Sequence, residues 1–231
     1  PPADWWRGFG SQPLDQLVRR ALQQNLEIAA AQARLRQAQS QVTIASASLW
    51  PSLSLSGLAE HSGSSQNSDR DHAYSAAGAA SYELDLWGSN RATRNAAIAQ
   101  RDAVQFDQAT VRTTTVASVV NRYLEWLALE ERIRVANNNL TNAQQVLNVV
   151  EARYRYGADT ALSLAQQRAQ VASQTAAIPS LQQQARQARA ALAVLSGRPA
   201  QGFTLESTRL DHLRLPEATQ DLPAAVLARR P

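Results

Sequence analysis

The side chains best suited to chemistry in this sequence lie around one polar, turn-forming segment. His61 and His72 flank it, and Glu60, Asp69 and Asp71 are their close neighbours. Imidazole and carboxylate groups bind divalent metals, but a metal site also needs its ligands held in a defined geometry. The spacing here matches no specific ligand pattern, and the glycine, serine and asparagine residues between the histidines are typical of an external loop. We therefore predict no metal site.

Two more carboxylates, Glu83 and Asp85, end a segment in which apolar and polar residues alternate. They lie on its polar face, which either lines an aqueous lumen or ends in bulk solvent, and the sequence leaves both interpretations open. In a lumen they would favour the passage of cations. The sequence contains no nucleophile–base constellation, phosphate-binding loop or catalytic carboxylate pair at a rigid junction. We predict no enzymatic activity and no cofactor.

The composition is dominated by alanine, glutamine and arginine, which favours long helices with narrow packed seams over a thick globular core. The sequence has no cysteine, which excludes disulfides and thiolate metal sites. The net charge is +4, and the arginines are spread over all segments without a concentrated basic face, so nucleic-acid binding is not expected. No run approaches the ~20 apolar residues that a membrane helix needs.

Helical periodicity is clearest over 26–49, which follows a short predicted helix at 13–24. One track of large apolar residues and one track of alanines each repeat every seven positions, and together they alternate by three and four. This spacing predicts a left-handed coiled coil, and alanine on one track lets the partner helix approach closely. The two tracks are Ile28, Leu35, Val42 and Leu49, and Ala31, Ala38 and Ala45.

A β-hairpin is predicted after Pro51, with strands over 52–62 and 73–87. In both strands apolar residues alternate with small or polar ones. This fits membrane strands with an aqueous lumen behind them, and it also fits a soluble hairpin with one wet face. In a membrane, the aromatic residues would lie in the interfacial belts, although plain packing is the alternative. The residues expected to face lipid or its interface are Trp50, Leu53, Leu55, Tyr74, Tyr82 and Leu84.

Two further helices are predicted, one over 89–156 without proline or glycine and one over about 160–196, separated by a tight turn at Gly157. In the second helix, a change of heptad register at Pro179 is expected to kink the helix or shift its packed face. The seam tracks of the long helix are Val119, Trp126, Ile133, Leu140, Leu147 and Tyr154, and Leu129, Ala136, Ala143 and Val150. Those of the second helix are Leu162, Ala165, Ala169, Ala172 and Ala176, then Leu181, Ala185, Ala188, Leu192 and Leu195.

The helix lengths fit together as a wall or stalk. At 1.5 Å per residue, the 89–156 helix is ~100 Å long, and the helices over 26–49 and 160–196 measure ~36 Å and ~55 Å. One long helix is thus matched by two shorter antiparallel ones laid end to end. A two-stranded hairpin cannot satisfy its edges in lipid, so a membrane location predicts oligomerisation into a closed sheet.

Four stretches resemble the TolC-like outer-membrane factors (outer membrane efflux proteins), more closely their OprM/NodT lipoprotein branch. They are PLDQLVRRALQQNLEIAAAQARLRQAQSQVTIASASLWPSLSLSG, SYELDLWGSNRATRNAA, ARYRYGADTALSLAQQRAQ and LPAAVLARRP. Their motifs are "AL..N" and "P.L", "DL.G..R" at the strand exit, "R...G" at the helix turn, and the "RRP" that opens the family's second repeat. They follow one another in the family's order and cover nearly the whole chain.

The resemblance implies a mainly α fold with a small β part, a TolC-like α/β-barrel half-subunit holding the first of two repeats. It implies a homotrimer in the outer membrane of a Gram-negative bacterium, a twelve-stranded transmembrane β-barrel above a helical tunnel through the periplasm. Such ducts are passive, work with a periplasmic adaptor and an inner-membrane efflux pump, and export drugs or other toxic compounds. Selectivity lies mostly in the pump, so nothing here names the cargo. The lipid anchor is expected upstream of residue 1, and the second repeat after Pro231.

In family terms, the chain divides into seven segments. They are a lead-in with a short equatorial helix (1–25), the upper tunnel helix (26–50), the membrane hairpin (51–88), the long tunnel helix (89–156), the periplasmic tip turn (157–160), the returning tunnel helix (161–197), and an equatorial segment with the linker (198–231).

The tip is implied to dock the adaptor, although an ordinary helix-hairpin turn has the same sequence features. The residues assigned to docking are Arg153, Tyr154, Tyr156, Gly157, Ala158, Asp159, Thr160 and Leu162. Ser163 stands where TolC itself has an aspartate that ties the closed tip, so that contact is not carried over. Two alternatives remain: a soluble periplasmic coiled-coil structural or adaptor protein, and an enzyme on a helical scaffold.

Overall fold

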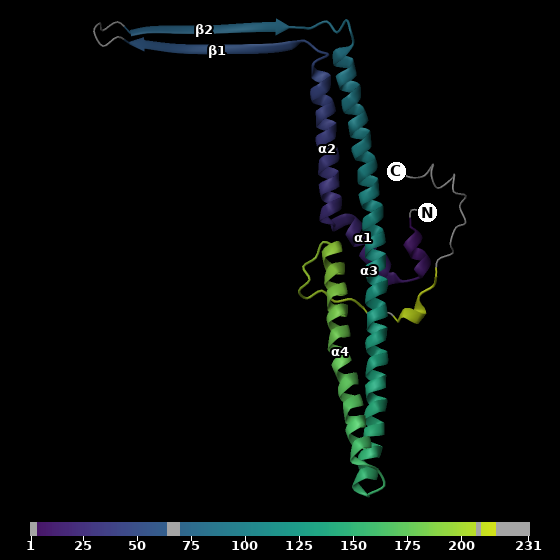
Figure 1. Ribbon diagram of the computed structural model, residues 1–231. Helices are drawn as coiled ribbons and strands as arrows, with labels where there is room; N and C mark the ends of the chain where they lie inside the picture. Colours follow the sequence, from purple (N-terminus) through teal and green to yellow (C-terminus); the bar gives the residue numbers. More distant parts are fainter. Residues whose placement is uncertain (1–3, 64–69, 207–208, 216–231) are drawn as a thin grey trace. The chain divides into compact units, whose positions relative to one another are not determined.

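A computed structural model describes residues 4–63, 70–206 and 209–215 (Figure 1). Long helices and one antiparallel hairpin make up the fold, which confirms the predicted class. The polar loop predicted between the two strands covers 63–72, but the structure places Gly63 and residues 70–72 in the strands. Residues 64–69 and the LPAAVLARRP stretch lie outside the described residues. The elements are η1 (Trp5–Phe9), α1 (Gln12–Gln24), α2 (Leu26–Ala47), β1 (Ser52–Gly63), β2 (Arg70–Ser81), α3 (Ser89–Arg155), α4 (Ala161–Leu195) and η2 (Leu210–His212).

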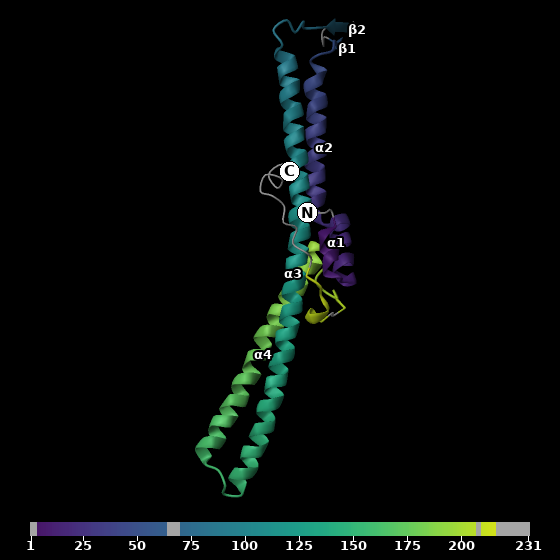
Figure 2. The same ribbon diagram turned by 90° about the vertical axis from the view of Figure 1, so that its right-hand side faces the viewer.

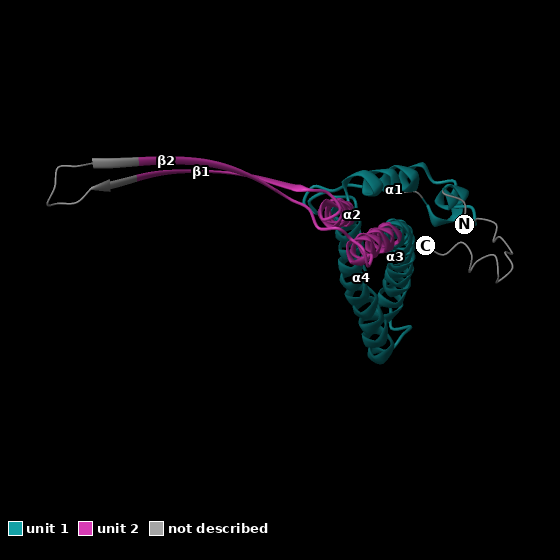
Figure 3. Ribbon diagram, turned by 90° about the horizontal axis from the view of Figure 1, so that it is seen from above, with its two compact units in different colours: residues 1–30, 109–231 teal, residues 31–108 magenta. Residues whose placement is uncertain are grey.

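Two compact units divide the chain, and each is described by itself (Figure 3). The first comprises residues 1–30 and 109–231, and the second comprises residues 31–108. In the first unit, α4 runs beside the C-terminal part of α3 (Figures 1 and 2). The α3 seam is as predicted: every position on its two tracks is buried or half-buried except Tyr154, which is exposed at the end of the helix.

The α4 seam differs from the prediction. The predicted first track, Leu162 to Ala176, is exposed, and the buried seam steps by three and four through Pro179 without a break. The predicted register change is therefore wrong. The buried seam contains two glutamines, which a search for apolar residues at heptad spacing does not select. One of them, Gln167, donates its amide N–H to the Ala143 carbonyl (3.1 Å) across the helix pair. The observed seam consists of Leu164, Gln167, Val171, Gln174, Ile178, Leu181, Ala185, Ala188, Leu192 and Leu195.

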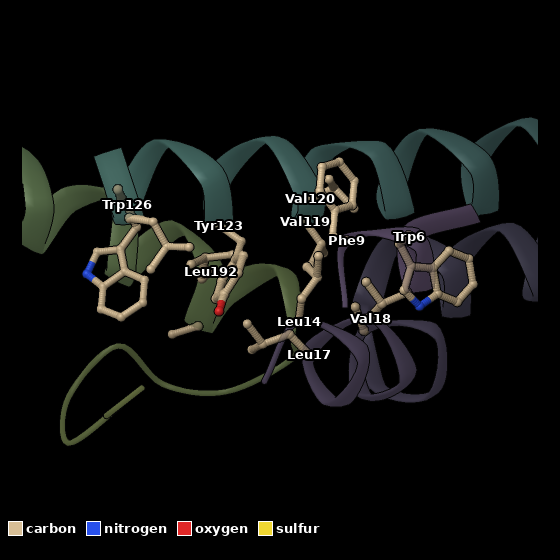
Figure 4. Close-up of a cluster of buried hydrophobic side chains, with 14 of the residues drawn as sticks. Trp6, Phe9, Leu14, Leu17, Val18, Val119, Val120, Tyr123, Trp126 and Leu192 are labelled. Atoms are coloured by element: carbon tan, nitrogen blue, oxygen red, sulfur yellow. The ribbon is translucent and has the colours of Figure 1, made fainter. Parts of the chain in front are cut away.

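The thickest core lies where η1 and α1 cover α3 and the C-terminal end of α4 (Figure 4). Tyr123 is fully buried there, and its hydroxyl hydrogen-bonds the Ser11 hydroxyl (3.0 Å), which also accepts from the Leu14 N–H as the N-cap of α1. At the surface of this core, partial burial acts to raise the pKa of the Asp15 carboxyl. The hydrogen bond from Trp6 and the charge of Arg19 outweigh that burial and hold the pKa below its usual range. The cluster ties the N-terminal helices to both long helices.

A splice, formed by Asn25 and the residues around it, joins α4 to α2. The Asn25 amide oxygen accepts from the backbone N–H groups of Glu27 (2.9 Å) and Ile28 (3.1 Å), and so caps the start of α2. Its amide nitrogen donates to the carbonyl of Leu195 (2.9 Å), the last residue of α4. One buried side chain therefore serves both the end of α4 and the start of α2.

The second unit contains most of α2, the hairpin and the N-terminal part of α3. All seven predicted seam residues of α2 are buried or half-buried, and α2 runs beside α3 in both views (Figures 1 and 2). In the hairpin, β1 pairs with β2 in continuous antiparallel register from Ser52↔Ser81 to Gly63↔Arg70. None of the described helices combines the length and apolarity required to cross a bilayer.

Candidate functional site

The turn between α3 and α4, which we call the tip, has a defined backbone geometry. Gly157 adopts φ 74°, which a glycine reaches without strain. The Ala158 N–H donates to the Arg153 carbonyl (2.8 Å) and the Gly157 N–H donates to the Tyr154 carbonyl (3.0 Å), the two bonds of a Schellman motif. The last carbonyls of α3 are thus satisfied, and the turn is held rigidly.

The other side of the tip is the start of α4. The Thr160 hydroxyl accepts from the Ser163 N–H (3.1 Å) as the N-cap, and the Asp159 carboxylate accepts from the Thr160 N–H (2.8 Å). Further from the turn, Arg168 of α4 pairs with Glu151 of α3 (2.9 Å) and fastens the two helices together. Each of these bonds joins residues of the turn or of the two helix ends beside it.

The surface of the tip combines exposed apolar groups with positive charge. Tyr156 is 84% exposed and Leu162 68% exposed, and Tyr154 is also exposed. Arg153 and Arg155 end α3, and no described carboxylate pairs with either of them. A shallow groove beside the turn is lined by Glu151, Tyr154, Arg155, Ala161, Leu164, Ala165 and Arg168. The structure thus brings the eight tip residues selected from sequence onto one small surface.

The hairpin register gives the two strands one apolar and one hydroxyl-bearing face, because directly paired residues point to the same side of a sheet. The apolar face holds Leu53, Leu55, Gly57, Ala59, Tyr74, Ala76, Gly78 and Ala80. Leu53, Leu55 and Tyr74 are each at least 80% exposed, and Trp50, which precedes β1, is 73% exposed. Such a contiguous exposed apolar surface is typical of a binding or membrane surface.

The second strand is shorter than predicted. It ends at Ser81, so Tyr82, Glu83, Leu84 and Asp85 belong to a connection rather than to the strand. The reason lies in α3, because the Asp85 carboxylate accepts from the backbone N–H groups of Asn90 (3.1 Å) and Arg91 (3.0 Å) and so turns the chain into the helix. Asp85 also pairs with the Arg91 guanidinium. Its predicted place within the strand is therefore wrong, and its assignment to a lumen stays a prediction.

The other residues of this connection stay as predictions. Tyr82 and Leu84 are exposed, as is Glu83. Tyr82 and Leu84 remain assigned to lipid, and Glu83 to a lumen, because of their residue types. These assignments no longer follow from the alternation of residues along a strand.

Sequence reasoning did not recognise that α4 and α2 each carry a second seam, which is exposed; on α4 it assigned that seam to the packing within the helix pair. On α4 it is the track Leu162, Ala165, Ala169, Ala172 and Ala176. At 100° per residue, this track lies about 160° around the helix from the buried seam. On α2 the track Leu26, Ala30, Ala33, Gln37, Ser40, Ile44 and Ala47 is likewise exposed. Each of these helices thus carries a heptad seam on two nearly opposite faces, and only one of them is covered in the chain.

Comparisons with known proteins agree with these features. The family model described as "Outer membrane efflux protein" matches residues 17–198. The chain is 42% identical to the pyoverdine export outer membrane protein OpmQ of Pseudomonas aeruginosa, over 98% of this chain and 50% of that protein. It is 40% identical to OpmQ of Pseudomonas putida, over 100% of this chain and 52% of that protein. The solved structure of the outer-membrane channel OprN superimposes with a TM-score of 0.84 at 25% identity, over 98% of this chain and 52% of OprN. The chain spans about half the length of these relatives.

Proposed function

Because this chain belongs to the outer membrane efflux protein family, we propose that it forms one repeat of a passive export duct through the outer membrane and periplasm. The working unit is a homotrimer of two-repeat subunits, which takes its cargo from a periplasmic adaptor and an inner-membrane pump. The cargo that we assign is pyoverdine, the compound named for the two OpmQ relatives, ahead of drugs and other toxic compounds. The proposal gives the chain no catalytic step.

The two opposite seams of α4 carry this proposal. A helix that packs on one side only needs a single seam, as in a helical hairpin. A helix in the wall of a tube has a neighbour on each side, and it needs two seams with solvent-facing surfaces between them. The exposed track of alanines meets this requirement, because small side chains let a neighbouring backbone approach closely. We assign it to a helix of the next repeat in the ring.

The exposed hairpin supports a membrane location. Two strands alone leave unpaired backbone groups at both edges, which lipid cannot satisfy. Pairing with hairpins from other repeats would close the sheet and place the apolar face of Leu53, Leu55 and Tyr74 against lipid. Trp50 would then lie at the interface, where tryptophan is enriched.

Ala169→Glu in the two-repeat protein is expected to lower pyoverdine export about tenfold or more, because an unpaired carboxylate would be buried between adjacent helices. Ala177→Glu is the matched control, since Ala177 is exposed between the two seams of the same helix. Both variants are introduced into cells that lack the protein, and pyoverdine is measured in the medium and periplasm while trimers are counted by native electrophoresis. Full pyoverdine export by cells that lack the protein would refute the proposed function. Normal trimer formation by Ala169→Glu would refute the assignment of the exposed α4 track to contacts between repeats.

Changing the charge of the tip is expected to weaken adaptor binding. Arg153→Glu with Asp159→Asn should reduce adaptor affinity about tenfold, because the change alters the charges that meet the adaptor. Asparagine can still accept the Thr160 N–H bond, so the turn is kept. Arg186→Glu is the control, since Arg186 is an exposed arginine of α4 about 36 Å from Leu162 at the tip. The measurement is titration of purified adaptor against the reconstituted trimer, and equal affinities for all three proteins would exclude the tip as the docking surface.

A further inference from the structure

Among residues 52–60 and 73–81, whose side chains the structure describes, the hairpin register places one charged residue on the hydroxyl-bearing face. That face contains the pairs Ser52↔Ser81, Ser54↔Ala79, Ser56↔Ala77, Leu58↔Ser75 and Glu60↔Ala73. All hairpin serines whose side chains the structure describes lie on this face, and so does Glu60. Within residues 52–60 and 73–81, whose side chains the structure describes, the opposite face carries no charged residue, and its only polar side-chain group is the Tyr74 hydroxyl. The two faces therefore differ sharply in polarity, and Leu58 is the single large apolar side chain on the hydroxyl-bearing face.

Resting on the proposed function, we propose that Glu60 is a charge-selecting residue of the duct lumen. In a sheet closed around water, the apolar face meets lipid and the serine face lines the lumen. On the serine face a carboxylate meets water, whereas on the apolar face it would meet lipid or the lipid interface, which disfavours a charge. This placement follows from the alternation of side chains between the two faces of the strand. Glu60 is then the described strand residue that would set the sign of the charge inside the duct.

Its position along the strand adds to this role. Glu60 lies eight residues beyond Ser52, which is about 26 Å from the helical end of the strand. It therefore lies near the mouth that is farthest from the helices. Three copies in a trimer place three carboxylates around that mouth. A ring of like charges in a narrow opening raises the local concentration of cations and lowers that of anions.

Glu60 differs in this respect from the two carboxylates that follow β2. The Asp85 carboxylate is committed to the first N–H groups of α3 and to Arg91. Glu83 lies beyond the last strand residue, Ser81, at the opposite end of the hairpin. Glu60 alone of the three lies within a strand and on a face defined by the register.

The test is the reversal potential of the two-repeat protein in planar bilayers under a KCl gradient. Glu60→Gln is expected to lower the ratio of K⁺ to Cl⁻ permeability about threefold at low salt, since it removes the field of the ring. The difference should shrink at high salt, where the Debye length falls to about 3 Å. Adding Ala73→Glu to Glu60→Gln should restore selectivity, because residue 73 is the registered partner on the same face. Ser56→Ala is the neutral control on that face and should change nothing.

The outcomes separate the two proposals. Channels with wild-type selectivity in Glu60→Gln would overturn the lumen role of Glu60 and leave the duct standing. Lost selectivity in Glu60→Gln that Ala73→Glu does not restore would overturn the assignment of this face to the lumen. Failure of the wild-type protein to form any channel would overturn the proposed function, and the role of Glu60 with it.

Discussion

Gly197→Ala is expected to destabilise the protein by about 2–4 kcal/mol, which would be among the largest effects of any single methyl group in the chain. Gly197 has φ 70°, where an alanine is strained. A Cβ at this position would also lie 2.3 Å from the Gln24 carbonyl oxygen and 2.9 Å from its carbon. Because both are backbone atoms, neither can move aside without disturbing the splice at Asn25.

Gly202→Ala separates the two causes. Gly202 also has φ 70°, but a Cβ there has nothing within 4 Å, so only the conformational strain applies. We expect this control to cost about 1 kcal/mol. The measurement is thermal unfolding of the two-repeat protein in detergent, followed by circular dichroism. Equal shifts in Tm for the two variants would show that the close approach to Gln24 does not contribute.

Asn25→Ala is expected to have the second large effect, lowering the free energy of unfolding by about 2–3 kcal/mol. The substitution removes the cap from the N–H groups of Glu27 and Ile28, which typically costs about 1 kcal/mol. It also leaves the half-buried Leu195 carbonyl without the bond that Asn25 donates. The loss of a partner for a buried polar group adds about 1–3 kcal/mol.

Thr160→Ala is the matched control for the cap alone, because Thr160 caps α4 at the exposed tip and bonds no second helix. Its expected cost is about 1 kcal/mol. The free energies of unfolding of the three proteins can be compared by denaturant titration. If Asn25→Ala lowers the free energy of unfolding no more than Thr160→Ala does, the bond to Leu195 adds no stability. Asn25 would then act only as the N-cap of α2.

Helix positions followed from the sequence because proline, glycine and heptad spacing mark them directly. The choice of seam on α4 did not. Alanine repeats at seven-residue spacing on one face, while the buried face contains Gln167 and Gln174. Spacing alone cannot say whether a seam is covered within the chain or by another chain, since both need the same period. On α2, where Ile28, Leu35 and Val42 mark one face, the prediction was correct.

In the hairpin, too, one part of the structure follows from the sequence pattern and another part does not. Alternation fixed the two faces of β1 and β2, but it continued past Ser81 and did not mark the end of the strand. That end is set by Asp85, whose bonds to Asn90 and Arg91 belong to the start of α3. From the sequence, Glu60 is considered only as a neighbour of His61 in a metal site that is rejected, because the pairing of Glu60 with Ala73 requires the register. The glycine at 157 located the tip from sequence alone.

The splice at Asn25 also orders events in time. Asn25 and Leu195 lie 170 residues apart in the chain, so the bond between them cannot form until α4 has been made. Contacts of such separation slow folding, because a long loop must close before they form. α1 and α2 are also made before α3, so their apolar faces stay uncovered while that next helix emerges. Any holding factor that protects this protein on its route to the membrane would meet α1 and α2 first, with the apolar seam of Ile28 and Leu35 still uncovered.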